Sequence, residues 1–150
     1  MADRSIEVLA RGVLVKGGRL LTCRSVRRGT RYLPGGHVEW GETSPEALRR
    51  EWMEELGVDC RVGAFLGIEE QTYPLDGEDV AEISTVFWVE CDALKGEGAG
   101  EASPESHIRF EWVPLEALGE SELMPAGIRR ALPGWIGARE TAASRYVVGS

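Results

Sequence analysis

Residues 36–58 read GHVEWGETSPEALRREWMEELGV, and this stretch decides the fold expected for the chain. Its central segment, Arg50-Glu51-Trp52-Met53-Glu54-Glu55, places three carboxylates within five positions of an expected helix. Because positions i, i+3 and i+4 share one helical face, the three glutamates should be neighbours, with Cβ atoms roughly 5 to 6 Å apart. Like charges at this spacing repel each other and raise each other's pKa. A hard divalent cation, Mg²⁺ or Mn²⁺, is the simplest partner that would compensate them.

The ends of this helix are marked in the surrounding sequence. Thr43 supplies a hydroxyl for an N-cap, Pro45 suits the first turn, and Glu46 completes the spacing of a capping box. Gly57 suits the left-handed conformation that ends a helix, so we expect a helix from about Pro45 to Leu56. Its buried stripe should consist of Ala47, Leu48, Trp52 and Leu56. The three glutamates are then expected on a different face from the core.

The rest of the chain alternates between β-prone and loop-like segments. Two β-prone runs, 6–15 and 19–24, flank Lys16-Gly17-Gly18, whose paired glycines suit a hairpin turn. The proline and glycines of residues 32–36 are expected to break any regular element. Segments 58–73 and 80–90 contain strand-like runs, including 61–68 and 83–89, and another strand is expected at 108–113. We also expect a long acidic loop at 91–106, short helices at 114–118 and 124–132, and a loosely held tail at 139–150.

The composition argues against several classes of protein. A length of 150 residues favours a single domain spanning residues 1–150. The formal net charge of −8 argues against binding a nucleic-acid polymer through a basic face, and no apolar run approaches the roughly 20 residues of a membrane span. Cys23, Cys60 and Cys91 show no CxxC spacing, so we expect buried, reduced thiols and a cytoplasmic protein.

The acidic stretch resembles a known family motif. Gly36, five residues, Glu42, seven residues and then Arg50-Glu51-x-x-Glu54-Glu55-x-Gly57 match the Nudix box, so residues 36–58 are similar to those of MutT-like Nudix hydrolases. The resemblance implies an α/β/α sandwich with a mixed β-sheet between helices. It also implies an enzyme that uses a divalent metal to cleave a phosphoanhydride bond in a nucleoside diphosphate linked to another moiety. Members of the family are commonly dimers, so the resemblance allows a homodimer.

The resemblance further implies which residues hold the metal. Its ligands would be Glu51, Glu54, Glu55 and the backbone carbonyl of Gly36. Such a set suits Mg²⁺, which prefers oxygen ligands and keeps some of its waters. A metal of this kind neutralises phosphate charge and lowers the pKa of a bound water, which then attacks phosphorus.

A carboxylate must accept the proton of that water. By resemblance it is a glutamate of the box, Glu54 or Glu55, or one from a downstream loop, where Glu105 matches best and Glu101 and Glu97 follow. A different role is implied for two other charged residues of the box. Glu42 and Arg50 would pair to lock the loop onto the helix, since a bidentate arginine–carboxylate contact has suitable geometry.

Residues outside the box are assigned by weaker patterns. Arg24 and Arg31 precede it and are candidates for gripping substrate phosphates, although an arginine-rich loop is more often a solvated turn. His37 and His107 are expected to be hydrogen-bonding residues and not metal ligands. The aromatic side chains of Trp40, Tyr73 and Trp88 are either base-stacking residues or parts of the core and its rim.

The substrate therefore stays open among a nucleoside triphosphate such as an oxidised dGTP, ADP-ribose or another nucleotide sugar, and a non-nucleotide diphosphate. Two rival interpretations predict no catalysis. One is a Nudix domain that senses nucleotides without cleaving them, but such domains often lose a box glutamate and this chain keeps all of them. The other is an acidic protein that binds divalent ions and releases no phosphate.

Overall fold

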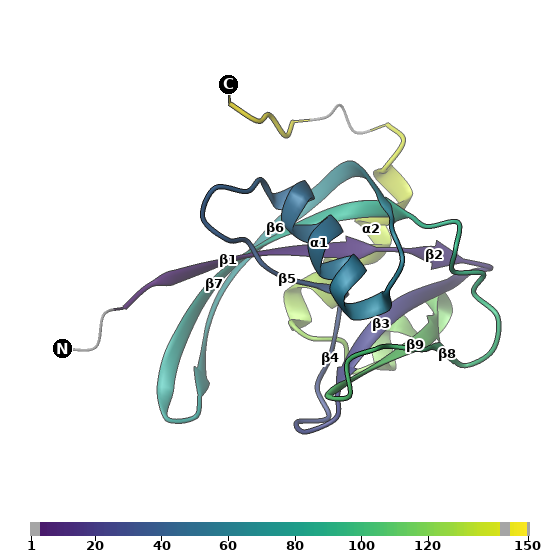
Figure 1. Cartoon of the computed structure of the whole chain (residues 1–150), viewed down its shortest axis with the longest axis horizontal. Coiled ribbons are helices and arrows are strands. Elements are labelled where there is room, and N and C mark those ends of the chain that lie inside the picture. Colours follow the sequence, from purple (N-terminus) through teal and green to yellow (C-terminus); the bar gives the residue numbers. More distant parts are fainter. Residues whose placement is uncertain (1–3, 142–144, 150) are drawn as a thin grey trace.

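The computed structural model describes residues 4–141 and 145–149 and contains two β-sheets with helices on both sides (Figure 1). The strands are β1 (Ile6–Val13), β2 (Val15–Lys16), β3 (Arg19–Ser25), β4 (Arg31–Tyr32), β5 (Gly35–His37), β6 (Arg61–Leu75), β7 (Glu78–Glu90), β8 (Gly100–Glu101) and β9 (Ile108–Pro114). The helices are α1 (Ser44–Leu56), the 3₁₀ helix η1 (Leu115–Glu120) and α2 (Ala126–Ala138). One sheet has the order β5-β1-β7-β6, and the other has the order β2-β3-β9-β8 with β4 beside β3.

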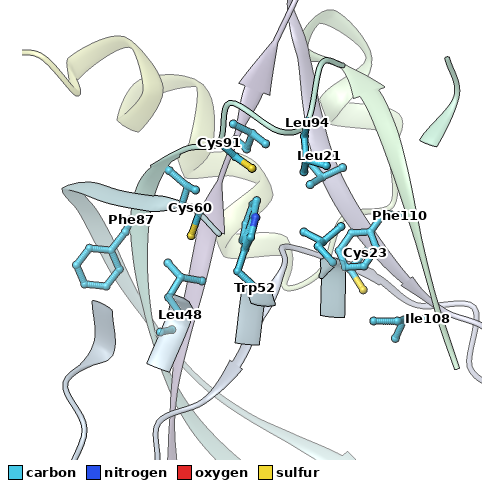
Figure 2. Close-up of a cluster of buried hydrophobic side chains, with 14 of the residues drawn as sticks. Leu21, Cys23, Leu48, Trp52, Cys60, Phe87, Cys91, Leu94, Ile108 and Phe110 are labelled. Atoms are coloured by element: carbon cyan, nitrogen blue, oxygen red, sulfur yellow. The ribbon is translucent and has the colours of Figure 1, made fainter. Parts of the chain in front are cut away.

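The helices α1 and α2 each pack against the sheets through a hydrophobic cluster of their own. In Figure 1, α1 lies in front of the strands and α2 lies behind them. Trp52 of α1 packs into a cluster with Leu21, Cys60 and Cys91, and Figure 2 shows its indole in the middle of these side chains. A second cluster includes Ile128 and Leu132 of α2 together with Val13 of β1. Because β1 pairs in parallel with β7 and antiparallel with β5, the sheet is mixed, and the expected α/β/α architecture is confirmed.

Helix α1 forms as its sequence predicts. It begins at Ser44 after the N-cap Thr43, whose hydroxyl accepts a hydrogen bond from the Glu46 amide at 3.3 Å, while the Glu46 side chain completes the capping box. Gly57 ends the helix with a φ of 71°. The expected stripe of Ala47, Leu48, Trp52 and Leu56 is buried. All these contacts lie within one stretch of chain, which is why local sequence predicts them.

The N-terminal strands differ in part from the prediction. Val15 pairs with Leu20 across the Lys16-Gly17-Gly18 turn, so the hairpin is confirmed, but the run 6–15 is divided at Leu14 between the two sheets. The prediction that residues 32–36 break all regular structure is wrong. Gly35–His37 form β5, because β1 offers these residues an antiparallel partner that the local sequence does not reveal.

Strands β6 and β7 form one long hairpin that projects beyond the rest of the sheet (Figure 1). The strands lie largely within the predicted segments 58–73 and 80–90, and each continues two residues further to a turn formed by Asp76 and Gly77, whose φ angles are 50° and 86°. An Asp-Gly turn of this type matches the twist of a hairpin. The guanidinium of Arg28 reaches the Asp76 carboxylate at 2.9 Å, so the loop after β3 touches the hairpin tip.

The C-terminal part is more ordered than predicted. The segment 114–118 corresponds to η1, and α2 continues past the expected end at residue 132 to Ala138. Of the predicted tail 139–150, residues 142–144 and 150 lie outside the described residues. Tyr146 packs edge-to-face against Phe87 with ring centroids 5.1 Å apart and contacts Phe65, so this part of the tail covers the core.

Two further expectations concern the cysteines and membrane spans. Cys23, Cys60 and Cys91 are free and buried, as predicted. Burial raises the pKa of the Cys23 thiol to about 12, which keeps it protonated. None of the helices in residues 4–141 and 145–149 combines the length and apolar character that a membrane crossing requires.

Helix α2 is capped from outside its own sequence. Its N-cap residue is Pro125, which offers no side-chain hydrogen bond to the first turn. The carboxylate of Glu69 on β6 takes that role and accepts a hydrogen bond from the Ile128 amide at 3.0 Å. A carboxylate at a helix N-terminus also interacts favourably with the helix dipole. Glu69 therefore fastens α2 to the long hairpin.

We expect Glu69→Ala to lower the free energy of unfolding by about 1 kcal/mol, the usual cost of removing a helix cap. Chemical denaturation followed by circular dichroism measures the change. Glu70→Ala is the matched control, because Glu70 is the next residue of β6 and its side chain is exposed. Equal stabilities of the two variants would contradict the capping role.

Candidate active site

Arg50 holds the centre of the acidic stretch together. Its guanidinium binds Glu42 in a bidentate contact, with Nε–Oε2 at 3.1 Å and Nη2–Oε1 at 2.7 Å. Nη2 also donates to the carbonyl of His37 at 3.0 Å, and Nη1 donates to Glu51 at 3.1 Å and reaches Glu54 at 3.4 Å. The hydrogen bonds from Arg50 hold the pKa of Glu42 below its usual value. The loop before α1 is therefore fixed to the helix, as the resemblance implied.

The three glutamates occupy different environments. Glu54 is about half exposed, whereas the side chain of Glu51 is 17% exposed and lies against the backbone of Gly36. A Cβ atom at Gly36 would come within 2.5 Å of the Glu51 carboxyl carbon, so glycine is required there. Glu55 departs in part from the expected position away from the core, because its side chain is half-buried and its Oε2 atom is buried with no hydrogen-bond partner among the described residues.

Glu55 is half-buried on the side of α1 whose core residues share a cluster with Cys23 of β3 and Tyr32 of β4. Its charge raises the pKa of both Cys23 and Tyr32, which places its carboxyl beside these two strands. Burial, and next the neighbouring Glu51 carboxylate, raise the pKa of Glu55 to about 8. The positive charge of Arg11 acts in the opposite direction. Of the repulsion expected among the three glutamates, the part between Glu51 and Glu55 is the one that raises a pKa in the structure.

The oxygen atoms around Glu51, Glu55 and Gly36 fit a divalent cation in part. Among the described residues, no three His, Cys, Asp or Glu side chains are gathered as a ready-made metal site. Arg50 is hydrogen-bonded to both Glu51 and Glu54 and compensates part of their charge. Two observations nevertheless fit a hard cation: the unpartnered, buried Oε2 atom of Glu55, and the all-oxygen donors that meet where Gly36 makes room for Glu51.

The acidic loop before β9 is tied to the C-terminal end of α1. The Ser103 hydroxyl donates to the Glu55 carbonyl at 2.5 Å, and the Glu105 amide donates to the Ser103 hydroxyl at 3.1 Å. The charge of Glu105 contributes to the raised pKa of Glu55, so these carboxylates are neighbours. Glu101 instead accepts a hydrogen bond from the Trp112 indole at 3.1 Å. Glu97 is exposed. Among these three downstream glutamates, Glu105 is therefore the one that lies near the box.

The two arginines assigned to phosphate binding lie in the β3–β4–β9 region. Arg24 donates to the Glu111 carboxylate at 2.8 Å and lines a hollow of about 700 Å³ together with Glu105. Arg31 donates to the Thr22 hydroxyl at 2.6 Å, and its side chain is only 11% exposed. Arg24 therefore lies near the acidic loop, whereas Arg31 is turned into the sheet. Their contact with a substrate stays a prediction.

Arg11 is a site residue that the sequence analysis missed. Its guanidinium donates to the Leu33 carbonyl at 3.2 Å and lies 5.2 Å from the centre of the Tyr32 ring. It lines a cleft of about 630 Å³ on the α2 side of the sheet, and its charge lowers the pKa of Glu55. An arginine within the apolar strand run IEVLARGVLV was the signal that could have identified it.

The cleft approaches the glutamates through Arg11 and His37, although Glu51, Glu54 and Glu55 do not themselves line it. His37 also lines the cleft, and its carbonyl is bound by Arg50. The floor and walls come from distant segments, among them Tyr73 and Glu82 of the long hairpin and the stretch around Pro125.

Comparisons with known proteins agree with this architecture. The family model described as "NUDIX domain" matches residues 6–134. The protein named "Putative 8-oxo-dGTP diphosphatase 2" of Mycobacterium tuberculosis is 31% identical over 135 residues, which cover 87% of this chain and 85% of that protein. "ADP-ribose pyrophosphatase" of Methanocaldococcus jannaschii is 30% identical over 101 residues, covering 65% of this chain and 57% of that protein.

A local match and a structural match complete the comparison. "8-oxo-dGDP phosphatase NUDT18" of Homo sapiens is 50% identical over 44 residues, or 29% of this chain, and the match spans only 14% of the human protein's length. The crystal structure of the MutT protein from Methanosarcina mazei Go1 superposes with a TM-score of 0.66 at 23% identity, over 95% of this chain and 100% of that one. At this identity the likeness concerns the fold alone.

We expect Arg50→Lys to lower the free energy of unfolding by about 1–2 kcal/mol, because an ammonium group cannot reproduce the bidentate contact with Glu42. Arg49→Lys is the matched control on the same helix. Arg49 makes its own bidentate contact with Asp59, but that pair is exposed and should contribute little. Urea denaturation of both variants measures the change in the free energy of unfolding. An equal loss in Arg49→Lys and Arg50→Lys would show that the contact with Glu42 stabilises the protein no more than the exposed contact with Asp59 does.

Proposed function

The chain belongs to the NUDIX family, and from that premise we propose that it is a divalent-metal-dependent pyrophosphohydrolase of nucleoside diphosphate derivatives. Its substrate would be a nucleoside diphosphate linked to another moiety, as in a nucleoside triphosphate, ADP-ribose or a nucleotide sugar. The substrates named for two relatives, 8-oxo-dGTP for one and ADP-ribose for the other, both fall within this class. The family resemblance itself, predicted from residues 36–58, is confirmed by the match over residues 6–134.

The single observation that carries this proposal is the group of carboxylates gathered around Arg50 and Gly36, which Arg11 and His37 connect to the cleft. Glu51, Glu54, Glu55 and the Gly36 carbonyl would hold Mg²⁺ or Mn²⁺, for which the buried, unpartnered Oε2 of Glu55 supplies an available ligand atom. When bound, such a cation neutralises phosphate charge and lowers the pKa of a coordinated water. The chain's own residues supply the remainder of the chemistry.

In the reaction, the water oxygen forms a bond to phosphorus while the bond between that phosphorus and the bridging oxygen breaks. The proton of the water passes to a carboxylate, for which we propose Glu105, because the loop that carries it is fastened to the Glu55 carbonyl by Ser103. Arg11, at the end of the cleft nearest Glu55, would bind the phosphate chain and hold it in place. Arg24 would act from the opposite side of the acidic loop.

A nucleotide-sensing domain without catalysis is the alternative. It would use the same cleft and metal, but it has no need for a carboxylate such as Glu105 held beside Glu55. The distinction is made by incubating the protein with Mg²⁺ and a panel of nucleotides and separating the products. Binding without product would favour the sensing domain.

Glu54→Gln and Glu55→Gln are each expected to reduce kcat by orders of magnitude on any substrate found, because each removes a proposed metal ligand. Product formation under saturating substrate measures this loss. Glu120→Gln, which alters an exposed carboxylate of η1, should leave the rate unchanged. Variants of Glu54 and Glu55 that cut as fast as the native protein would refute the assignment.

Glu105→Gln tests the proton acceptor separately. We expect kcat to fall roughly 10²- to 10⁴-fold with a small change in KM, since a general base acts on the chemical step more than on binding. The limb of the pH–rate profile that depends on this base should disappear as well. Glu120→Gln again serves as the control, and an unaltered rate in Glu105→Gln would transfer the role to Glu101, Glu97 or the box.

A further inference from the structure

Three polar side chains form a connected group on the floor of the cleft. Gln71 and Glu82 are directly opposite each other on β6 and β7, and the Gln71 amide donates to Oε2 of Glu82 at 3.1 Å. The Tyr73 hydroxyl donates to Oε1 of the same carboxylate at 2.6 Å. All three residues line the cleft of about 630 Å³. The Glu82 carboxylate is therefore held in one orientation by a donor on each oxygen.

The hydrogen bond from Tyr73 to Glu82 persists at neutral pH. Burial, followed by the bond to Glu82, raises the pKa of Tyr73 to about 12, so the phenol stays protonated and continues to donate. An ionised carboxylate has about four acceptor positions on its two oxygens. Gln71 and Tyr73 occupy one on each oxygen, which leaves one acceptor on each for a ligand. Glu82 thus presents a pair of parallel acceptors with fixed spacing.

The position of Glu82 matches the base end of a nucleotide. In the parallel pairing of β1 with β7, Glu7 is level with Glu82 and Arg11 is level with Val86. The backbones of Arg11 and Glu82 are therefore four residues apart along the sheet, about 13 Å at the rise of a strand. The Arg11 side chain shortens the separation of the charged groups, since its charge lowers the pKa of Tyr73, which is bonded to Glu82. The two groups lie at separate points of one cleft, as the phosphates and base of a nucleotide would require. A ligand with phosphates at Arg11 would place its base over Glu82.

The facing wall of the cleft suits a flat, apolar ring. It includes Leu33, Met124, Pro125 and Ile128, which come from the segment before β5 and from the start of α2. Pockets for small ligands usually combine such apolar walls with a few fixed polar groups that decide orientation. Here the fixed polar group is the paired acceptor of Glu82.

We propose that Glu82 is the specificity-determining residue for the base and selects a guanine-type ring. The proposal rests on the proposed function and names its substrate class. Guanine presents two adjacent N–H donors, N1–H and the exocyclic amino group, which complement two parallel carboxylate oxygens. The 8-oxo form of guanine keeps the same edge and is included.

Adenine is disfavoured by the same geometry. Its corresponding edge places one donor, the amino group, beside an acceptor, ring nitrogen N1. That nitrogen would face a carboxylate oxygen, so that two acceptors would meet without a proton between them. A site that holds a polar group for one partner rejects an analogue that leaves the group unpaired. The structure thus favours guanine nucleotides over ADP-ribose and other adenine nucleotides.

Glu82→Gln tests the assignment, because it keeps the size of the side chain while one acceptor oxygen becomes an amino donor. With Mg²⁺, we expect the native protein to hydrolyse dGTP with a higher kcat/KM than dATP, and the variant to lower the ratio of the two values about 10- to 100-fold. Glu78→Gln is the matched control, since Glu78 lies on the same strand, is exposed and does not itself line the cleft. That variant should keep the native ratio.

Two outcomes overturn the proposal: a native preference for dATP, or an unchanged ratio in Glu82→Gln. If Glu82→Gln does not fold, Tyr73→Phe decides, because removing one orienting donor should lower the ratio about 3-fold. If the native protein hydrolyses no nucleotide, the proposed function fails, and calorimetric titration with GMP and AMP still tests Glu82. Tighter binding of GMP that is lost in Glu82→Gln supports the assignment, and equal affinities refute it.

Discussion

The guanidinium of Arg50 is the interaction on which the rest of the site depends. Three carboxylates of α1 and one of the preceding loop crowd into a small volume, and their repulsion would push the loop away from the helix. Arg50 reverses this effect by binding Glu42, Glu51 and the His37 carbonyl together. Because a guanidinium carries several donors in a rigid plane, one residue can satisfy acceptors from three segments at once. The approach loop, the helix and strand β5 thereby become one rigid unit.

The sheets extend this unit into a binding cleft. Strand β1 pairs with β5 on one side and with β7 on the other, so the loop that carries the box and the long hairpin are attached to the same strand. The chain then continues through Leu14 into β2 and the second sheet. Displacement of β1 would move the glutamates and the cleft floor together. The geometry between the reacting end and the recognition end is therefore set by strand pairing and not by flexible loops.

The features that could be predicted from the sequence are those fixed by neighbouring residues. The capping box, the buried stripe of α1 and its end at Gly57 all depend on contacts within a few turns, and each is present. The pairing of Arg50 with Glu42 spans eight positions and was implied by the motif. By contrast, β5 was missed because its partner β1 lies some 25 residues earlier, and the full length of the β6–β7 hairpin depends on cross-strand pairing.

Other features depended on packing between distant segments. The partial burial of Glu55 accompanies the packing of α1 into one cluster with side chains of β3 and β4, which no periodicity in residues 44–56 reveals. Arg11 and Glu82 lie on different strands and acquire a common role only when β1 and β7 pair. Tyr146 was assigned to a loose tail, because nothing near it in the sequence indicates Phe65 and Phe87 as its partners. Local sequence thus predicted the box, and tertiary structure was needed for the cleft.

This division between box and cleft has an evolutionary consequence. The contacts that build the box are made almost entirely among residues 36–57, whereas the walls of the cleft are drawn from strands and loops far from it. Substitutions in the hairpin β6–β7 can therefore reshape the recognised base without disturbing Arg50 or the glutamates. New substrates can be accommodated by substitutions in the walls of the cleft while the box stays unchanged. The same hydrolytic reaction can in this way be applied to different substrates.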